Sequence, residues 1–421
     1  MTVRQTVLPN GLTIVTDFMD TVETVSLGVW VRVGSRYEPA AINGVSHMLE
    51  HMAFKGTHRR SARQIAEEIE SVGGHLNAFT SSEVTAYHAT VMKEDVALAV
   101  DIIADILQNS VFDEEELVRE RSVILQEIGH AQDSPEDLVF EAFQETAYPG
   151  QPLGRSILGP PEIVASMRRE SLIAYMAEHY GAARMVVAGA GKLDHEEFAT
   201  LCGDALGGLP AGSIAGPEMA QYRGGFAHLE RDFEQLHLVV GYAGPGARDD
   251  WRYAAGVASM VLGGGMSSRL FQEVRENLGL AYSIYSFTSL YEDAGIVGVY
   301  AGTGVEQAAL LLERLREELE KSVSDISEEE LRRAKAQLRA GVLMSLESTS
   351  SRAERLARDI AVYGKPVPYE TIIRAIASVS RDDVCDSLRR ILGTEATVAA
   401  VGPRHEKFDL KTLTASFSTA V

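Results

Sequence analysis

The sequence predicts an α+β fold made of two copies of one domain, each a mainly antiparallel sheet with helices packed on one face. Predicted strands and helices come in groups and do not alternate strictly, which is typical of this fold class. The two halves also echo each other. Gly44–Met48 matches Gly256–Met260, and Asp113–Leu117 matches Ser327–Leu331 at nearly the same separation along the chain.

The local sequence pattern predicts the strands and helices of the first copy. Val3–Leu8 and Leu12–Thr16 flank the turn sequence Pro9-Asn10-Gly11, which predicts a strand, a tight turn and a second strand. Glu83–Met92 alternates with the period of two that is typical of a strand. The further elements are a strand at Thr24–Val33 and helices at Val45–Phe54, Ala62–Val72, Glu94–Asn109 and Asp113–Gln132.

A short buried strand is predicted near the end of each half, at Val186–Gly189 in the first and at Val398–Gly402 in the second. Between the halves, residues 206–225 hold six glycines and two prolines with little periodicity, which is linker composition. We therefore predict a first domain at 1–210, a linker at 211–225 and a second domain at 226–421.

The composition is that of an ordinary globular chain, with 421 residues of which 45% are hydrophobic. Acidic residues number 60 and basic residues 39, and the net charge of −21 argues against nucleic acid or anionic membranes as partners. Cys202 and Cys385 are too few for a disulfide framework or a thiolate metal site, and we expect both to be buried. Because no apolar run approaches a membrane helix and no signal peptide is recognisable, we expect a cytoplasmic protein without a membrane span.

The first predicted helix contains His47-Met48-Leu49-Glu50-His51. His47 and His51 are four residues apart, so both imidazoles leave one helix face, at a separation that suits two ligands of one tetrahedral zinc ion. Glu50 flanks that face and can act without being a ligand. This H-x-x-E-H order inverts the better-known H-E-x-x-H arrangement. The alternative is a solvated helix face with two incidental histidines.

A catalytic zinc site needs a third protein ligand and one open position. Glu127 comes well after His51 in the sequence, on a separate predicted helix, and is a candidate for that ligand. Glu120 is one heptad earlier on the same helix face and could orient a histidine ligand or modulate the base. On local grounds His130 competes with Glu127, and any single carboxylate of this acidic helix could be a solvated surface charge.

Four stretches carry a family likeness: HMLEHMAFKGT (47–57), GGHLNAFTSSEVTAY (73–87), ERSVILQEI (120–128) and SSRLFQEVRENLGLAYSIYS (267–286). They resemble the pitrilysin and mitochondrial-processing-peptidase family of inverted-motif zinc metallopeptidases. The similarity spans nearly the whole chain, and at this length it is to the short two-domain bacterial members. It implies a zinc-dependent, processing-peptidase-like endopeptidase that hydrolyses peptides or unfolded segments inside a closed chamber.

The resemblance also implies a role for each residue of the site. His47, His51 and Glu127 would bind one zinc ion per chain, Glu50 would be the general base, and Glu120 an auxiliary catalytic carboxylate. At the equivalent positions of the repeat, the second copy replaces the ligands and the base by Ser259, Leu262, Gly263 and Gly341. The second copy is therefore expected to carry no metal and to grip the substrate.

Further residues are implied to bind substrate. Arg275 and Tyr282 would hold a peptide across the cleft from the zinc, through a guanidinium that grips a carbonyl and a hydroxyl that donates to a developing oxyanion. Without the resemblance, Arg275 would be a surface charge and Tyr282 a core residue. Asn77, Ala78 and Phe79 would border a sheet edge that pairs with an extended substrate. The alternative is an ordinary strand with Asn77 at a turn.

The expected partners are peptides, and the excess of acidic over basic residues in the chain favours basic, presequence-like peptides. Because one chain keeps both the zinc site and the gripping residues, we predict a homodimer, with a heterodimer that includes a motif-lacking homologue as the alternative. Three other functions stay open: a catalytically inactive structural or partner subunit of a heteromeric processing peptidase, a zinc-dependent hydrolase of a non-peptide substrate, and a module that binds peptides without cleaving them.

Overall fold

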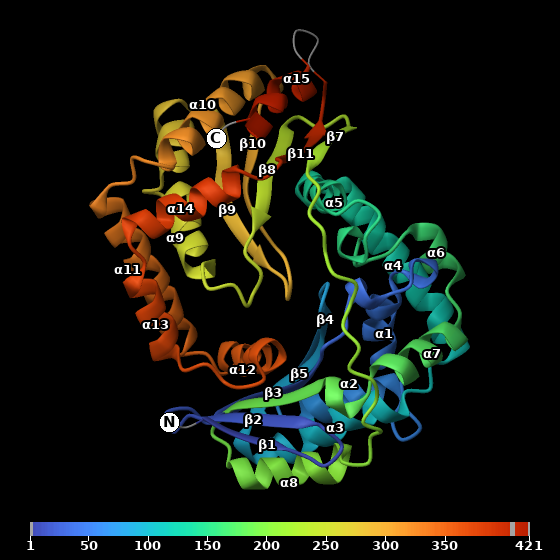
Figure 1. Ribbon diagram of the computed structural model, residues 1–421. Helices are drawn as coiled ribbons and strands as arrows, with labels where there is room; N and C mark the ends of the chain where they lie inside the picture. The colour runs from blue at the N-terminus through green and yellow to red at the C-terminus, as the bar shows by residue number, and fades with distance from the viewer. Residues whose placement is uncertain (1–2, 405–408, 420–421) are drawn as a thin grey trace. The chain divides into compact units, whose positions relative to one another are not determined.

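The computed structural model describes residues 3–404 and 409–419, which form two compact units, each with its own sheet (Figure 1). The first unit consists of Met1–Gly129, Arg155–Glu218 and Met344–Val367, and the second of His130–Gly154, Met219–Leu343 and Pro368–Val421. Residues 1–2, 405–408 and 420–421, which include the outer ends of both predicted domains, lie outside the described residues. Each unit takes in a segment from the other half of the chain, and the continuous domains 1–210 and 226–421 stay a prediction.

The first unit contains a six-stranded sheet in the order β1-β2-β6-β3-β5-β4. Its strands are β1 (Val3–Val7), β2 (Thr13–Phe18), β3 (Thr24–Val31), β4 (His75–Thr80), β5 (Thr85–Met92) and β6 (Met185–Gly191). β2 and β6 are parallel, and all other neighbours are antiparallel. The predicted strand, turn and strand at the N-terminus are confirmed, and Gly11 in the turn has a φ of 89°, which favours glycine.

The second unit contains a five-stranded sheet in the order β7-β11-β8-β10-β9. Its strands are β7 (Gly225–Glu230), β8 (Leu236–Gly244), β9 (Ala281–Leu290), β10 (Gly295–Thr303) and β11 (Thr397–Gly402). Again one pair, β7 and β11, is parallel and the others are antiparallel. Apart from β1, the two sheets share strand order and direction, so the predicted α+β fold and its internal repeat are confirmed. The two predicted buried strands are β6 and β11.

Helices from the same half of the chain pack on one face of each sheet. In the first unit these are α1 (Val45–Ala53), α2 (Ala62–Ser71), α3 (Val96–Asn109), α4 (Glu114–Asp133), α6 (Pro161–Ser166), α7 (Arg169–His179) and α8 (His195–Leu206). In the second unit they are α9 (Arg252–Gly263), the π-helical turn η6 (Phe271–Asn277), α10 (Ala308–Ser322), α11 (Glu328–Ser345), α13 (Tyr369–Ser378), α14 (Arg381–Leu392) and α15 (Leu410–Thr414). The ends of α1 to α4 differ from the predicted ends by at most two residues.

The opposite face of each sheet is covered by a helix from the other half of the chain. α12 (Thr349–Tyr363) covers the first sheet, where Leu356 lies in one apolar cluster with Trp30, and α5 (Pro135–Ala147) covers the second sheet. Along β3, Val29 faces the main core and the next residue, Trp30, faces α12. Because both faces of these sheets are apolar, each needs a cover on both sides.

The packing of α12 on the first sheet gives a testable prediction of stability. Leu356 is fully buried, so Leu356→Ala should lower the free energy of unfolding by about 2–5 kcal/mol through lost burial and the cavity it leaves. Arg358→Ala, at an exposed position of the same helix, should change it by less than about 0.5 kcal/mol. Urea unfolding followed by circular dichroism measures both, and equal midpoints for the two variants would contradict the packing of α12.

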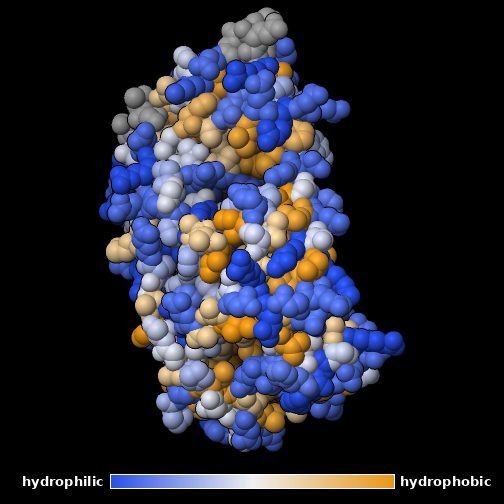
Figure 2. Space-filling model, turned by 90° about the vertical axis from the view of Figure 1, so that its right-hand side faces the viewer, coloured by the Kyte–Doolittle hydropathy of each residue, from blue (hydrophilic) through white to orange (hydrophobic). Residues whose placement is uncertain are grey.

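The surface and the cysteines agree with a globular chain. None of the described helices is both long and apolar enough to cross a membrane. On the face seen in Figure 2, hydrophobic residues are interspersed with hydrophilic ones. Cys202 and Cys385 are unpaired and buried, as expected, and burial raises the pKa of the Cys202 thiol to about 12. A buried thiol of this kind is unreactive.

Candidate metal centre

The helix that carries the histidine pair, α1, begins at a position that is fixed by its surroundings. Gly44, its first flanking residue, has a φ of 96°, and a Cβ there would lie 2.7 Å from the carbonyl oxygen of Leu158. The buried carboxylate of Glu38 accepts hydrogen bonds from the backbone N–H groups of Gly44 at 2.7 Å and of Ser46 at 2.8 Å. Glu38 thereby satisfies N–H groups that the first turn leaves without partners.

α1 is amphipathic, and its two faces have different tasks. The apolar side chains that face the core are at most 2% exposed: Val45, Met48, Leu49 and Met52. The other face of the helix carries His47, Glu50 and His51. Glu50 and His51 follow His47 by three and four residues, so the three side chains leave the helix on the same side. The core packing of one face therefore holds the polar residues of the other in place.

His47 and His51 converge with Glu127 of α4. The Nε2 atoms of His47 and His51 lie 3.7 and 3.4 Å from Glu127 Oε2, and the two imidazole centroids are 4.7 Å apart. Within the described part of the chain, these three residues are a group whose potential ligand atoms all lie within 4.8 Å of one another, and His130 is not part of it. The structure thus brings together the ligand set that the resemblance implies.

The donor set fits a zinc ion. Burial, together with the nearby charge of His51, lowers the pKa of the His47 imidazole to about 4, so His47 is neutral at pH 7 and can donate a lone pair. Two ligand atoms on a tetrahedral zinc ion lie ~3.4 Å apart. The observed nitrogen–oxygen distances of 3.4 and 3.7 Å to Glu127 are close to that value.

Glu120 lies behind the histidine pair. Its side chain is only 6% exposed, and its Oε2 accepts a hydrogen bond from His51 Nδ1 at 2.8 Å. The other oxygen, Oε1, is 2.7 Å from the ammonium of Lys55. A carboxylate on the outer nitrogen of a histidine fixes the ring and directs its other nitrogen towards a metal.

Glu50 lies beside the three converging residues and outside that group. The hydroxyl of Thr80, at the end of β4, donates a hydrogen bond of 2.7 Å to Glu50 Oε2. Burial raises the pKa of the Glu50 carboxyl above its usual range. Raised pKa values of this origin are typical of carboxylates that act as general bases.

The strand next to this site, β4, is at the edge of its sheet and pairs only with β5 among the described strands. It contains Asn77, Ala78 and Phe79, so the alternative that Asn77 occupies a turn is wrong. Asn77 is exposed, and its Oδ1 accepts a 2.8 Å hydrogen bond from the backbone N–H of Ala78. Whether this edge binds a substrate stays a proposal.

Arg275 and Tyr282 lie together in the second unit. The guanidinium carbon of Arg275 is 4.6 Å from the centroid of the Tyr282 ring and 4.7 Å from that of Phe271, which is a cation–π arrangement. Tyr282 is 76% exposed, so the alternative of a core residue is wrong. Both side chains are available at the surface of their unit, and their role towards the metal centre stays a proposal.

Comparison with known proteins identifies the family. The profile "Insulinase (Peptidase family M16)" matches residues 13–161, and "Peptidase M16 inactive domain" matches residues 166–338. An uncharacterized zinc protease of Rickettsia felis is 41% identical over 397 residues, which cover 94% of this chain and 96% of the relative. The chain belongs to peptidase family M16. The resemblance inferred from the sequence is therefore confirmed, including the short two-domain type.

Other M16 relatives have similar lengths. Uncharacterized zinc proteases of Bacillus subtilis and Streptomyces coelicolor are 39% and 38% identical, with 94% and 96% of this chain covered and 97% and 91% of the relatives. Two crystal structures match the fold. One is a protease from Helicobacter pylori with a TM-score of 0.88, 22% identity and coverage of 95% of this chain and 99% of that one. The other is a peptidase M16 inactive domain from Pseudomonas fluorescens with a TM-score of 0.90, 20% identity and coverage of 97% and 100%.

In this M16 chain, sequence reasoning missed three residues around the site: Glu38, Lys55 and Thr80. Lys55 lies beyond the end of α1, so its spacing from His51 gives no helical signal for the contact with Glu120. Glu38 and Thr80 also lack a local signal, because a loop and a separate strand bring them to α1. Contacts of this kind depend on the tertiary fold.

Proposed function

We propose that the chain is a zinc-dependent endopeptidase, similar to processing peptidases, that hydrolyses peptides or unfolded segments. The observation that carries the proposal is the convergence of His47, His51 and Glu127, with Glu50 beside them. The names of the M16 relatives, zinc proteases, support both the metal and the reaction class. A closed chamber that excludes folded proteins, and a cytoplasmic location, rest on the sequence alone.

His47, His51 and Glu127 would hold one zinc ion per chain. A zinc ion in this site supplies a Lewis acid that lowers the pKa of water and polarises a peptide carbonyl. Glu127 is 40% exposed on its side chain, so solvent and substrate reach the ligand side of the site. Glu120 holds the ring of His51 in the orientation that leaves Nε2 directed at Glu127.

Glu50 performs the proton transfers in the proposed reaction. Its carboxylate takes a proton from the water molecule that attacks the scissile carbonyl carbon, and then gives that proton to the leaving amine nitrogen. Thr80 holds Oε2 of Glu50 by a hydrogen bond, which limits the orientations of the carboxylate. The C–N bond breaks as the amine is protonated, so one water is consumed for each peptide bond.

Substrate binding is proposed at the free edge of β4 and at Arg275 with Tyr282. An extended peptide could add a strand at β4 through backbone hydrogen bonds, which tolerates many sequences. The exposed Tyr282 hydroxyl is a donor for the developing oxyanion, and Arg275 can grip a carbonyl or a C-terminal carboxylate. The excess of acidic residues supports basic peptides as substrates.

The gripping role predicts a catalytic defect without loss of metal. Tyr282→Phe should lower kcat by about 100-fold, which is typical for the loss of one oxyanion donor, and Arg275→Ala should weaken catalysis as well. A matched control exists in the same unit, where Arg252 lies over Tyr253 at 4.4 Å. Tyr253→Phe should leave turnover unchanged. Steady-state kinetics with zinc analysis measures this, and equal kinetics for the Tyr282 and Tyr253 variants would remove Tyr282 from the mechanism.

One experiment separates the proposed function from its alternatives. The purified chain is analysed for bound metal and assayed against a library of quenched fluorescent peptides, and light scattering gives its mass. The proposal expects zinc, cleavage and a homodimer. Zinc without cleavage by the pure chain, followed by cleavage once a second M16 chain is added, would support a heteromeric partner subunit. Peptide binding without metal or cleavage would support a binding module.

A further inference from the structure

The contacts of Lys55 link it to the candidate metal centre through one carboxylate. Lys55 Nζ lies 2.7 Å from Glu120 Oε1, and Glu120 Oε2 lies 2.8 Å from His51 Nδ1. The Glu120 side chain is 6% exposed and that of Lys55 is 30% exposed. Each oxygen of this buried carboxylate therefore has a charged or polar partner, and Lys55 is the cation that compensates its burial.

This arrangement decides which nitrogen of His51 carries the proton. An ionised carboxylate only accepts hydrogen bonds, so Glu120 requires a proton on His51 Nδ1. Nε2, the atom 3.4 Å from Glu127, then keeps its lone pair. A carboxylate held at one oxygen alone can turn about its bonds. With Lys55 at the second oxygen, Glu120 is fixed from both sides.

The second copy of the domain shows what accompanies loss of the metal ligands. At the equivalent positions of the repeat, the three residues that contact one another in the first copy are replaced by small residues. These are Gly263 for His51, Ser267 for Lys55 and Ala334 for Glu120. Neighbouring positions of α4 are kept in α11: Leu331 for Leu117, Glu330 for Glu116 and Arg333 for Arg119. The lysine and the carboxylate are thus absent where the metal site is absent, while the surrounding helix is retained.

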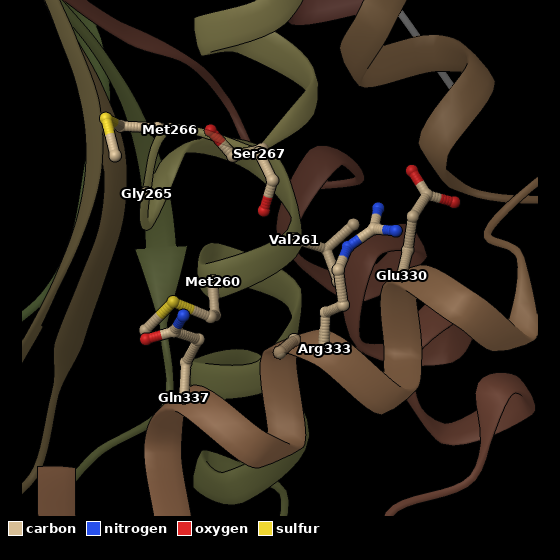
Figure 3. A pocket seen from close by; sticks show the side chains of 10 residues that line it. Met260, Val261, Gly265, Met266, Ser267, Glu330, Arg333 and Gln337 are labelled. Carbon is tan, nitrogen blue, oxygen red and sulfur yellow. The ribbon is translucent and has the colours of Figure 1, made fainter. Parts of the chain in front are cut away.

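In the second unit a different ion pair joins the segment after α9 to α11, between Arg269 Nε and Glu330 Oε1 at 2.6 Å. A cavity of about 410 Å³ lies between the 265–268 loop and α11, and Ser267 and Ala334 are among its lining residues (Figure 3). Glu330 and Arg333, the retained residues, line it as well. Both copies therefore join this segment to this helix by an ion pair, so an ion pair alone does not distinguish them. What distinguishes the first copy is that Glu120, the carboxylate paired with Lys55, also contacts His51, and this contact couples Lys55 to the metal site.

We propose that Lys55 is a positioning residue of the metal centre, which holds Glu120 so that His51 presents an unprotonated Nε2. The proposal rests on the proposed zinc site. Lys55 does not touch the ligand atoms in this account, and it acts through Glu120 alone.

The test is the zinc affinity of Lys55→Met, measured by competition with a chromophoric chelator. We expect affinity to fall about 10- to 100-fold, the usual range for loss of an outer-shell partner. Lys55→Arg keeps the cation and should restore most of the affinity. Arg59→Met removes a nearby cation that pairs with Asp101 at 2.8 Å away from the site, and it should bind zinc like the unmodified chain. Lys55→Gln repeats the test if Lys55→Met does not fold.

A spectroscopic readout separates positioning from general stability. In the metal-free protein, ¹⁵N NMR of labelled histidines should show the neutral ring of His51 protonated at Nδ1 in the unmodified chain, and protonated partly at Nε2 in Lys55→Met. Unchanged zinc affinity together with an unchanged His51 spectrum in Lys55→Met would overturn the proposal. If the unmodified chain itself binds no zinc, the proposed function fails, which is a different outcome.

Discussion

Glu50→Gln should abolish nearly all peptidase activity while zinc stays bound. The change removes the proton acceptor from the site but keeps the size of the side chain and its contact with the Thr80 hydroxyl. Loss of a general base costs about 10²- to 10⁴-fold in turnover. Because Glu50 is not part of the group of potential ligands, we expect one zinc ion per chain in the variant.

The measurement is kcat on a cleaved peptide together with zinc analysis of the same sample. Glu70→Gln makes the same substitution at an exposed position of α2 and should leave both quantities unchanged. Turnover by zinc-loaded Glu50→Gln within a few-fold of the unmodified chain would assign the base to another residue.

Removal of any one proposed ligand should release the metal ion and abolish the peptidase activity at the same time. His47→Ala, His51→Ala and Glu127→Ala each leave two of the three converging donor atoms, too few for a stable zinc site. We expect activity to fall by at least about 10²-fold, the order of loss that removal of a catalytic element causes. His130→Ala, on the same helix as Glu127, is the matched control and should keep its zinc. Zinc retained in Glu127→Ala but lost in His130→Ala would show that the third ligand is misassigned.

Local sequence pattern was sufficient for much of the fold and for the two histidines of the candidate ligand set. The helical spacing of His47 and His51 and the apolar face beneath them are properties of one short segment, so α1 could be placed to within one residue of its end. Glu127 was different, since an acidic helix offers many carboxylates. The resemblance to a family selected it, and the structure brings it to the histidines.

Features that depend on tertiary packing could not be predicted. The amphipathic pattern of α12 shows that one face is buried but not which sheet it covers, and the structure packs it on the sheet of the other half. A sheet edge at Asn77–Phe79 was expected only through the resemblance, and the alternative interpretation placed Asn77 at a turn, whereas the structure places it within β4. The contact of Lys55 with Glu120 joins residues that lie far apart in the sequence, which a pattern along one helix cannot reveal.

A titration of zinc into the metal-free chain tests the central claim most directly. The chain is stripped with a chelator, zinc is returned in small steps, and peptide cleavage is measured at each step. A single site formed by His47, His51 and Glu127 predicts no cleavage at the start, a linear rise, and a break at one zinc ion per chain. Cleavage by the metal-free chain, or a fully loaded chain that cleaves no peptide, would contradict the account.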